Sequence, residues 1–376
     1  MENGVKRKLM LTLVALLFVA AAVAYAIYWF GSGQFEQSTD DAYVSGNLVQ
    51  IMPQLSSNVI AVYADDTQWV KMGQPLVLLD GADADLALVK AEADLGQTVR
   101  KVKQLYAVAG ALDADIELRQ AELEKARSDL VRRNSLIGEH AVSREDVQHA
   151  ESSLAQAQSA LDAAKQQRNA ARVMVANTTL QQHPDVLKAE AVLRQAYLAV
   201  QRLSIAAPVS GYVAKRSVQI GQRVNQDTPL MVIVPLNQIW VDANFKENQL
   251  GKIRIGQPVT LTTDIYGKGV VFHGKVAGLG AGTGSVFSLL PAQNATGNWI
   301  KIVQRLPVRV SLDAGEVAKH PLRVGFSMDV DVDTHDQRGL SLSTQEQTVP
   351  IYTTAIFADK DVAVDQLIAK ILQKNS

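Results

Sequence analysis

The chain has 376 residues, 47% of them hydrophobic, and a formal net charge of −1. This near-neutral balance, with no basic face or Lys/Arg stripe, argues against nucleic acid as a partner. The absence of cysteine excludes a disulfide scaffold, a thiolate metal site and a cysteine nucleophile.

The N-terminus has the pattern of a membrane anchor. Residues 1–8 form a basic tail, and residues 9–30 form an uncharged apolar run that is long enough to cross a hydrocarbon core of ~30 Å. Because basic flanks stay in the cytoplasm, we expect the bulk of the chain to lie outside it. A cleaved signal peptide is the alternative, with Ala24-Tyr25-Ala26 as a passable cleavage pattern. The apolar run exceeds the usual length of about 7–15 residues, so an uncleaved anchor is favoured.

Two short β-patterned stretches flank a long helical one. Residues 31–45 are polar and are predicted to be a linker, whereas residues 46–80 and 204–236 alternate short apolar runs with turn residues. The two stretches are related by an internal repeat, in which Val59, Val70, Pro75, Leu76 and Leu79 correspond to Val213, Val224, Pro229, Leu230 and Ile233. A repeat this small is not a solenoid. It predicts one β domain built from both halves, which resembles the lipoyl/biotinyl-carrier fold.

Residues 81–203 are predicted to form an antiparallel coiled-coil hairpin. Strong helix formers fill the stretch, and a seven-residue apolar repeat predicts a helix packed along its length on a partner helix. Ser143, followed by acidic residues, is an N-cap signal and places the tip at about residues 134–143. Pro184 shifts the register of the second arm, while Arg119 and Arg168 are polar exceptions that set register or contact neighbouring copies. The predicted seam residues are Leu95, Val102, Ala109, Ile116, Leu123, Leu130, Val147, Leu154 and Leu161.

The remainder of the chain is β-patterned and then polar. Residues 237–335 contain short β-type runs punctuated by Gly, Asn and Pro, which is typical of a small antiparallel barrel. The C-terminal segment, residues 336–376, starts polar and ends in the pattern of a short amphipathic helix. The sequence therefore predicts an elongated α+β chain. It has an N-terminal transmembrane helix, a lipoyl-like domain split by a long α-hairpin, and a β-barrel.

No pattern in the sequence indicates catalysis, a cofactor or a metal site. Residues 278–284 contain Gly-x-Gly spacing but lack the Lys-Ser/Thr ending of a phosphate loop. The six histidines are scattered without metal-ligand spacing, and no serine sits in a Gly-x-Ser-x-Gly elbow. We therefore expect a protein that is not an enzyme.

Local motifs carry a resemblance to a known family. Residues 278–285 and 291–299 look like this family's barrel, and the more specific motifs are Thr39-Asp40-Asp41-Ala42-Tyr43-Val44, Ala207-Pro208-Val209-Ser210-Gly211-Tyr212-Val213, and Trp240-Val241-Asp242-Ala243-Asn244-Phe245-Lys246-Glu247. Together with the order of elements, they make the chain similar to the HlyD-type membrane fusion proteins. These are periplasmic adaptors of export machines, and the likeness is greatest to the EmrA-like multidrug efflux adaptors.

The resemblance implies a single-pass protein of the bacterial inner membrane with a periplasmic bulk. Its implied partners are a proton-driven major-facilitator pump of the EmrB type, a TolC-like outer-membrane channel and further copies of itself, and the implied cargo is hydrophobic drugs. Arg132, Leu136 and Ser143 match the Arg-x3-Leu-x6-Ser pattern by which similar adaptors meet the channel. The alternative is that Ser143 is only an N-cap and Leu136 only a seam residue. Arg133 leaves open which arginine points outward.

Two other functions remain open. An adaptor for protein or peptide secretion by an ABC transporter shares the fold and would have a neighbouring ATPase in place of a permease. A biotin or lipoate carrier would have a modified lysine in the turn between the two halves of the lipoyl-like domain. The hairpin occupies that point, and Lys71 lies inside the first half, which argues against a carrier.

Overall fold

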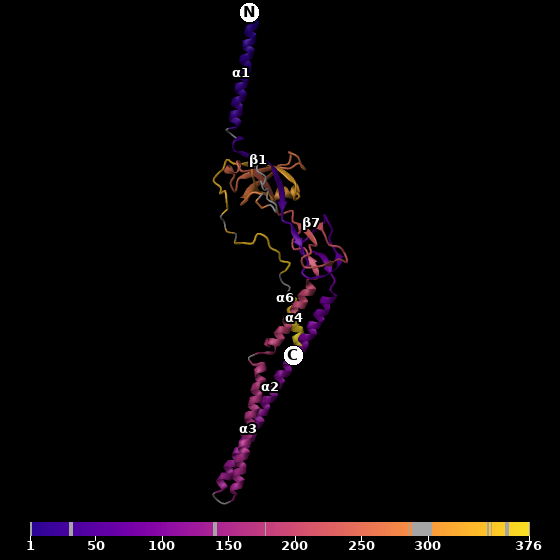
Figure 1. The fold of residues 1–376 in the computed structure, drawn as a ribbon, viewed down its shortest axis with the longest axis vertical. Coiled ribbons are helices and arrows are strands. Elements are labelled where there is room, and N and C mark those ends of the chain that lie inside the picture. Colours follow the sequence, from indigo (N-terminus) through magenta and orange to yellow (C-terminus); the bar gives the residue numbers. More distant parts are fainter. Residues whose placement is uncertain are drawn as a thin grey trace, which may run out of the picture.

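The structure is a computed structural model. It describes residues 2–29, 33–137, 141–176, 178–284, 286–287, 303–343, 346, 348–357 and 361–375. The molecule is long and narrow: the N-terminal helix projects from a barrel, a second β domain follows, and a helical hairpin forms the far end (Figure 1). The predicted elongated α+β architecture is thereby confirmed.

The N-terminal helix α1 (Glu2–Tyr28) includes most of the predicted anchor. Most of its described side chains are apolar and exposed, among them Leu11, Leu16 and Phe18. Within the described residues, no helix combines the length and the apolar character that crossing a membrane requires.

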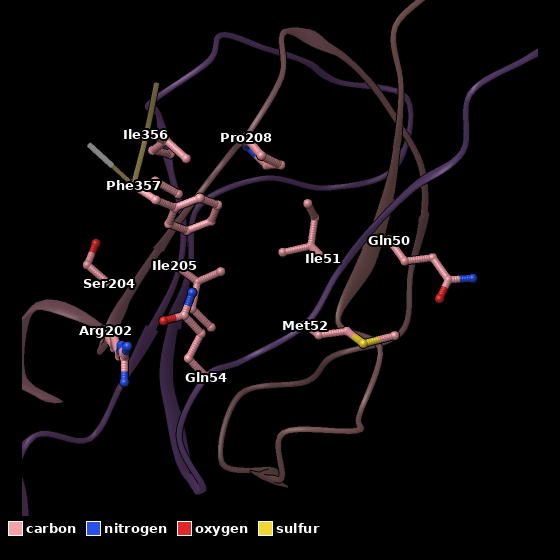
Figure 2. Close-up of a pocket in the computed structure, with 11 residues that line it drawn as sticks. Gln50, Ile51, Met52, Gln54, Arg202, Ser204, Ile205, Pro208, Ile356 and Phe357 are labelled. Atoms are coloured by element: carbon pink, nitrogen blue, oxygen red, sulfur yellow. The ribbon is translucent and has the colours of Figure 1, made fainter. Parts of the chain in front are cut away.

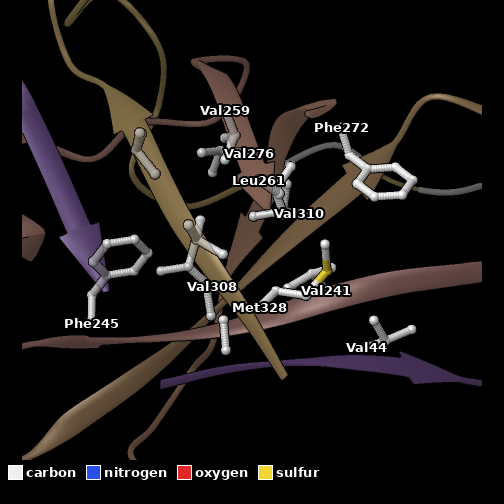
Figure 3. Close-up of a cluster of buried hydrophobic side chains, with 14 of the residues drawn as sticks. Val44, Val241, Phe245, Val259, Leu261, Phe272, Val276, Val308, Val310 and Met328 are labelled. Carbon is white, nitrogen blue, oxygen red and sulfur yellow. The ribbon is translucent and has the colours of Figure 1, made fainter. Parts of the chain in front are cut away.

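A closed antiparallel barrel stands next to α1 (Figure 1). Its strands alternate inward apolar and outward polar residues, and the inward set, which includes Phe245, Leu261 and Phe272, fills the interior (Figure 3). A short helix, α5 (Ala314–Lys319), lies between the last two strands in the sequence, β13 and β14. Around the barrel the strands are β1 (Glu36–Gly46), β10 (Ile239–Lys246), β13 (Arg305–Leu312), β12 (Phe272–Leu279), β11 (Pro258–Thr262) and β14 (Ser327–Asp333).

The assignment of residues 31–45 to a linker is wrong. Most of this segment belongs to β1, which pairs with β10 on one side and with β14 on the other. Along β1, exposed and partly buried positions alternate. Residues 36–41 are all polar, so this alternation cannot be seen in the sequence. The barrel is therefore built from one strand that precedes the second β domain in the chain and from five strands that follow it.

The second β domain consists of two four-stranded sheets, with orders β2-β9-β7-β4 and β6-β5-β3-β8. Each sheet takes two strands from each sequence half, as the internal repeat predicts. The first half supplies β2 (Val49–Ile51), β3 (Ser57–Val62), β4 (Trp69–Val70) and β5 (Pro75–Leu79). The second half supplies β6 (Ser204–Ala206), β7 (Gly211–Arg216), β8 (Arg223–Val224) and β9 (Met231–Val234).

Repeat-related residues form the core of this lipoyl-like domain. Leu76 and Leu79 from the first half and Leu230 and Ile233 from the second are at most 1% exposed. Gly211, in the second sequence motif, begins β7 where a Cβ atom would lie 2.5 Å from the carbonyl oxygen of Val234. Only glycine permits this close approach of two strands.

The hairpin leaves the lipoyl-like domain as one uninterrupted helix and returns as two. The outgoing arm is α2 (Ala82–Ile137), whose 56 residues at about 1.5 Å each make a rod of roughly 80 Å. The returning arm is α3 (Arg144–Val175), a 3₁₀ turn at Leu180–Gln182, and α4 (Pro184–Gln201). Pro184 is the first residue of α4, where its missing N–H and fixed φ are tolerated.

Candidate functional site: the hairpin and its tip

The predicted seam residues are buried or half-buried along the two arms, and on α2 their burial is deepest near the lipoyl-like domain. Fully or nearly fully buried are Leu95, Val102, Ala109, Val147 and Leu161. Half-buried are Ile116, Leu123, Leu130 and Leu154. Packing of α2 is shared between α4, near the lipoyl-like domain, and α3, which continues to the tip.

Arg168, a polar exception in the seam, joins the two arms. Its Nη1 lies 3.7 Å from Oδ1 of Asp113 on α2, and Nη2 of Arg172 lies 3.2 Å from the other oxygen of the same carboxylate. Among the described residues, the Nε atom of Arg168 has no hydrogen-bond partner although it is buried. This ion pair fits the register-setting role better than a contact with a neighbouring copy.

Replacing Arg168 by leucine is expected to leave the hairpin's stability unchanged or to raise it by about 1 kcal/mol. The substitution removes a partly buried charge with an unpaired nitrogen and completes the apolar seam. Asp113→Ala is expected to lower stability instead, because it leaves the Arg168 guanidinium without its partner. Urea unfolding followed by far-ultraviolet circular dichroism checks both. An Arg168→Leu variant that is less stable than Asp113→Ala would contradict this account of the seam.

The structure places the two tip arginines differently. The Arg132 side chain is 71% exposed and its guanidinium pairs only locally, with Asp129 one turn back. Arg133 is half as exposed: its Nε donates to Asp129 Oδ2 at 2.8 Å, and its Nη1 lies 3.9 Å from Asp146 Oδ1 on the other arm. Arg132 therefore points outward and Arg133 braces the arms. The Asp-x3-Arg spacing from Asp129 to Arg133 indicates the ion pair within α2, but nothing in the sequence indicates the contact with Asp146 on the other arm.

Ser143 begins the second arm as a capping box. Its hydroxyl oxygen accepts from the Asp146 N–H at 3.0 Å, while the Asp146 carboxylate accepts from the Ser143 N–H at 3.1 Å and from its hydroxyl at 2.6 Å. These hydrogen bonds, chiefly the one from the hydroxyl, hold the pKa of Asp146 below its ordinary range. Leu136, at the end of the first arm, is half-buried. The capping geometry agrees with the N-cap interpretation of Ser143. Of the three predicted docking residues, Arg132 and Leu136 are the two whose side chains do not take part in this cap.

The capping box predicts a pH-dependent tip. A carboxyl whose pKa is lowered on folding stabilises the native state above its unfolded value of about 4 and loses that contribution as pH falls through the folded pKa. Ser143→Ala is expected to raise the pKa of Asp146 and to weaken the first turn of α3 by about 1 kcal/mol. The carboxyl ¹³C shift of Asp146, followed against pH, measures this. A titration midpoint unchanged by Ser143→Ala would show that the cap does not control Asp146.

The motif at the start of the barrel is structural in this fold. Trp240, Asp242, Asn244, Phe245 and Lys246 all lie on β10, which pairs directly with β1, the strand that carries the Thr39–Val44 motif. The two sequence motifs are therefore adjacent strands.

Side chains across this strand pair interlock. The Thr39 hydroxyl donates to the Asn244 carbonyl at 2.9 Å, and the Asn244 amide donates to Asp41 at 3.3 Å. The Trp240 indole N–H donates to Asp242 at 2.9 Å, beneath the Arg309 guanidinium, 4.1 Å from the ring centre. The contacts of Thr39 and Asp41 join β1 to β10, and the contact of Arg309 with Trp240 joins β10 to β13.

The structure also places the glycine-rich stretch and Lys71, which the sequence analysis considered as possible binding sites. The Gly-x-Gly stretch begins at the end of β12, and residues 291–299, which resemble the family's barrel, lie outside the described residues. Lys71 is exposed, directly after β4. Across the part of the chain that the structure describes, no three His, Asp or Glu side chains gather to hold a metal ion.

Comparison with known proteins connects these elements to one family. The family model of the EmrA alpha-helical hairpin domain matches residues 82–203. The chain is 47% identical to the multidrug export protein EmrA of Escherichia coli, over 94% of this chain and 91% of that protein. It is 44% identical to the fatty acid resistance protein FarA of Neisseria gonorrhoeae, over 98% and 94%.

A solved structure of the periplasmic adaptor protein EmrA overlaps 80% of this chain and 99% of that chain, at 19% identity and a TM-score of 0.39. Because this sequence identity and this TM-score are low, the family assignment rests on the sequence relatives and on the family model of the hairpin. By identity and by coverage, the chain belongs to the EmrA family of membrane fusion proteins.

Proposed function

We propose that the chain is the periplasmic adaptor of a tripartite multidrug efflux system. It links a major-facilitator-type pump in the inner membrane to a TolC-like channel in the outer membrane. The observation that carries this proposal is a rod of roughly 80 Å whose far end presents an exposed Arg132. The functions named for two relatives, multidrug export and fatty acid resistance, support export of hydrophobic compounds.

The arrangement of the ends suits a bridge. Helix α1 and the barrel lie at one end of the molecule and the hairpin tip at the other (Figure 1). We infer from the sequence that the apolar run of residues 9–30 is a single-pass anchor in the inner membrane, with the N-terminus cytoplasmic and the bulk of the chain periplasmic. The basic residues before the apolar run and the exposed apolar side chains of α1 support this placement. The barrel, next to α1, would then meet the pump.

The tip has the chemistry of a docking site for a channel. The exposed Arg132 guanidinium offers several N–H donors in a fixed plane to carbonyl or carboxylate oxygens. Leu136 supplies an apolar contact beside it, and Ser143 holds the start of the second arm in place. Docking at residues 132, 136 and 143 would use side chains already positioned by the brace between Arg133 and Asp146.

Self-association would complete the conduit. A single two-helix rod leaves a large part of its sides in solvent, including Val108, Leu118 and Val173. Side-by-side packing of several hairpins would bury such residues and enclose a path between the membranes.

Deleting the gene and restoring it on a plasmid tests the proposal. The deletion strain is expected to become several-fold more susceptible to hydrophobic drugs, and the full-length chain is expected to restore resistance. Unchanged drug susceptibility together with loss of a secreted protein would favour an ABC-type secretion adaptor. A mass shift on a single lysine of the purified chain would favour a carrier.

A further inference from the structure

The C-terminal segment runs back along the whole β region instead of ending at the barrel (Figure 1). At the barrel, the Ile255 N–H donates to the Leu340 carbonyl at 2.9 Å, and the Gln257 side chain donates to the Asp336 carbonyl at 2.8 Å. At the lipoyl-like domain, the Thr354 hydroxyl donates to the Pro208 carbonyl at 2.8 Å. The segment is therefore attached to two domains before its final helix begins.

A cavity of about 300 Å³ marks the second attachment (Figure 2). Ile356 and Phe357 line one side of it, and Ile51, Ile205 and Pro208 of the lipoyl-like domain line the other. This cavity lies beside the Thr354 hydrogen bond, and from here the chain continues to the base of the hairpin.

The final helix, α6 (Asp361–Asn375), packs on that base. Val364, Ile368 and Leu372 recur every four residues, lie on one face of the helix and are 0–8% exposed. They enter an apolar groove formed by Leu95, Val99 and Val102 of α2 and by Val186, Leu193 and Ala196 of α4. The base of the hairpin is thus a three-helix bundle.

Polar contacts and one glycine fit the groove to this helix. Asp365 forms an ion pair with Arg194 of α4, with 2.5 Å between Oδ1 and Nη2. The Asn375 side chain accepts a hydrogen bond from Arg100 of α2. A Cβ atom on Gly96 would lie 3.3 Å from the Asn375 amide nitrogen. Glycine inside a helix costs about 1 kcal/mol relative to alanine, and here its small size lets α6 approach α2 closely.

The groove ends where the returning arm is interrupted. Helix α4, which α6 covers, begins at Pro184. Hydrogen bonds of the Tyr106 and His183 side chains stabilise the interruption between α3 and α4. The Tyr106 hydroxyl of α2 donates to the Thr178 carbonyl at 2.6 Å, and His183 bridges the Met174 carbonyl and the Asp185 N–H at 3.0 and 3.2 Å. Beyond this point only α2 and α3 pair to form the rod.

We propose that the C-terminal segment is a clamp. It ties the barrel, the lipoyl-like domain and the first section of the hairpin into one unit, with α6 as the part that fixes the hairpin's direction. This goes beyond the proposed export function, because it assigns a role to residues outside the hairpin domain and is independent of which pump or channel is bound.

Spin-label distances test the clamp in a chain that has no native cysteine. One label is placed at Val89 on the hairpin base and one at Asp264 on the barrel, both of which are exposed. The unmodified C-terminus is expected to give a narrow distance distribution. Val364→Asp puts a charge into the apolar groove and is expected to broaden the distribution at least twofold.

Val362→Asp is the matched control, because Val362 is on the same helix but 59% exposed. It is expected to leave the distribution narrow. A distribution that is equally narrow in the Val364→Asp variant, or equally broad in all three chains, would overturn the clamp.

A chemical crosslink at exposed positions provides a second test that leaves the apolar groove unchanged. Arg194→Cys and Asp365→Cys replace the ion pair between α4 and α6 and, treated with a short bismaleimide, are expected to crosslink within one chain, which peptide mass spectrometry detects without a covalent dimer on a denaturing gel. A covalent dimer would mean that α6 docks on a neighbouring copy, and absence of any crosslink would mean that the groove does not hold α6. Either result overturns the intramolecular clamp.

Discussion

Phe245→Ala is expected to lower the free energy of unfolding of the barrel by about 3–5 kcal/mol, the cost of emptying a buried aromatic site. Phe245 is fully buried in the barrel core. It lies on β10 between β1 and β13, so the cavity forms where the first strand of the barrel meets strands far away in the sequence. A loss of this size is a large part of the free energy of unfolding of an ordinary small domain.

Thermal unfolding followed by the near-ultraviolet signal measures this loss. Phe287→Ala is the control, because it makes the same change at a side chain that is 72% exposed, and it is expected to unfold like the parent chain. The barrel and the hairpin are separate cores, so the far-ultraviolet helical signal of the Phe245→Ala variant should persist through the first transition. Equal melting of the two variants would contradict the position assigned to Phe245.

Arg132→Ala combined with Leu136→Ala is expected to abolish recovery of an outer-membrane channel with the adaptor and to remove its contribution to drug resistance. Central arginine and apolar contacts of interfaces commonly cost about 2 kcal/mol or more each when truncated, so a loss of two to three orders of magnitude in affinity follows if both contribute. The hairpin itself should keep its stability, because Arg132 is 71% exposed and Arg133 retains the brace to the second arm.

The matched control removes the same two side-chain types farther from the tip. Arg127 is 69% exposed and Leu86 is 70% exposed, both on α2. Arg127→Ala combined with Leu86→Ala is expected to retain the channel and the resistance. If both double variants lose the channel, the docking site is not confined to the tip; if neither does, residues 132 and 136 do not carry it.

Periodic segments were the most predictable part of this fold. The seven-residue repeat locates the hairpin because a coiled-coil seam needs apolar residues at fixed spacing, and the internal repeat predicts a β domain made of two halves because both halves use the same turn and core positions. Strand β1 escaped prediction because its buried face at residues 36–41 consists of polar side chains that are only partly buried. Its place in the barrel depends on pairing with residues about two hundred positions later.

Contacts between distant segments explain the rest. Val99 is fully buried yet lies outside the predicted seam, and it belongs to a core cluster that contains residues of α6 as well as of α4. A heptad analysis of α2 describes only the pairing of two helices, so it cannot reveal a third. The amphipathic pattern of residues 361–375 predicted a helix but not the surface that receives it. At the tip, adjacent Arg132 and Arg133 are equivalent in sequence, and only the position of Asp146 on the other arm separates their roles.

The bridging role is tested most directly by co-purification. The tagged full-length chain is crosslinked mildly in cells, extracted from membranes, and its bound proteins are identified by mass spectrometry. We expect to recover a multi-spanning permease together with an outer-membrane channel, and to lose the channel alone from the Arg132→Ala, Leu136→Ala variant. Recovery of an ATPase in place of the permease, or of neither partner, would contradict it.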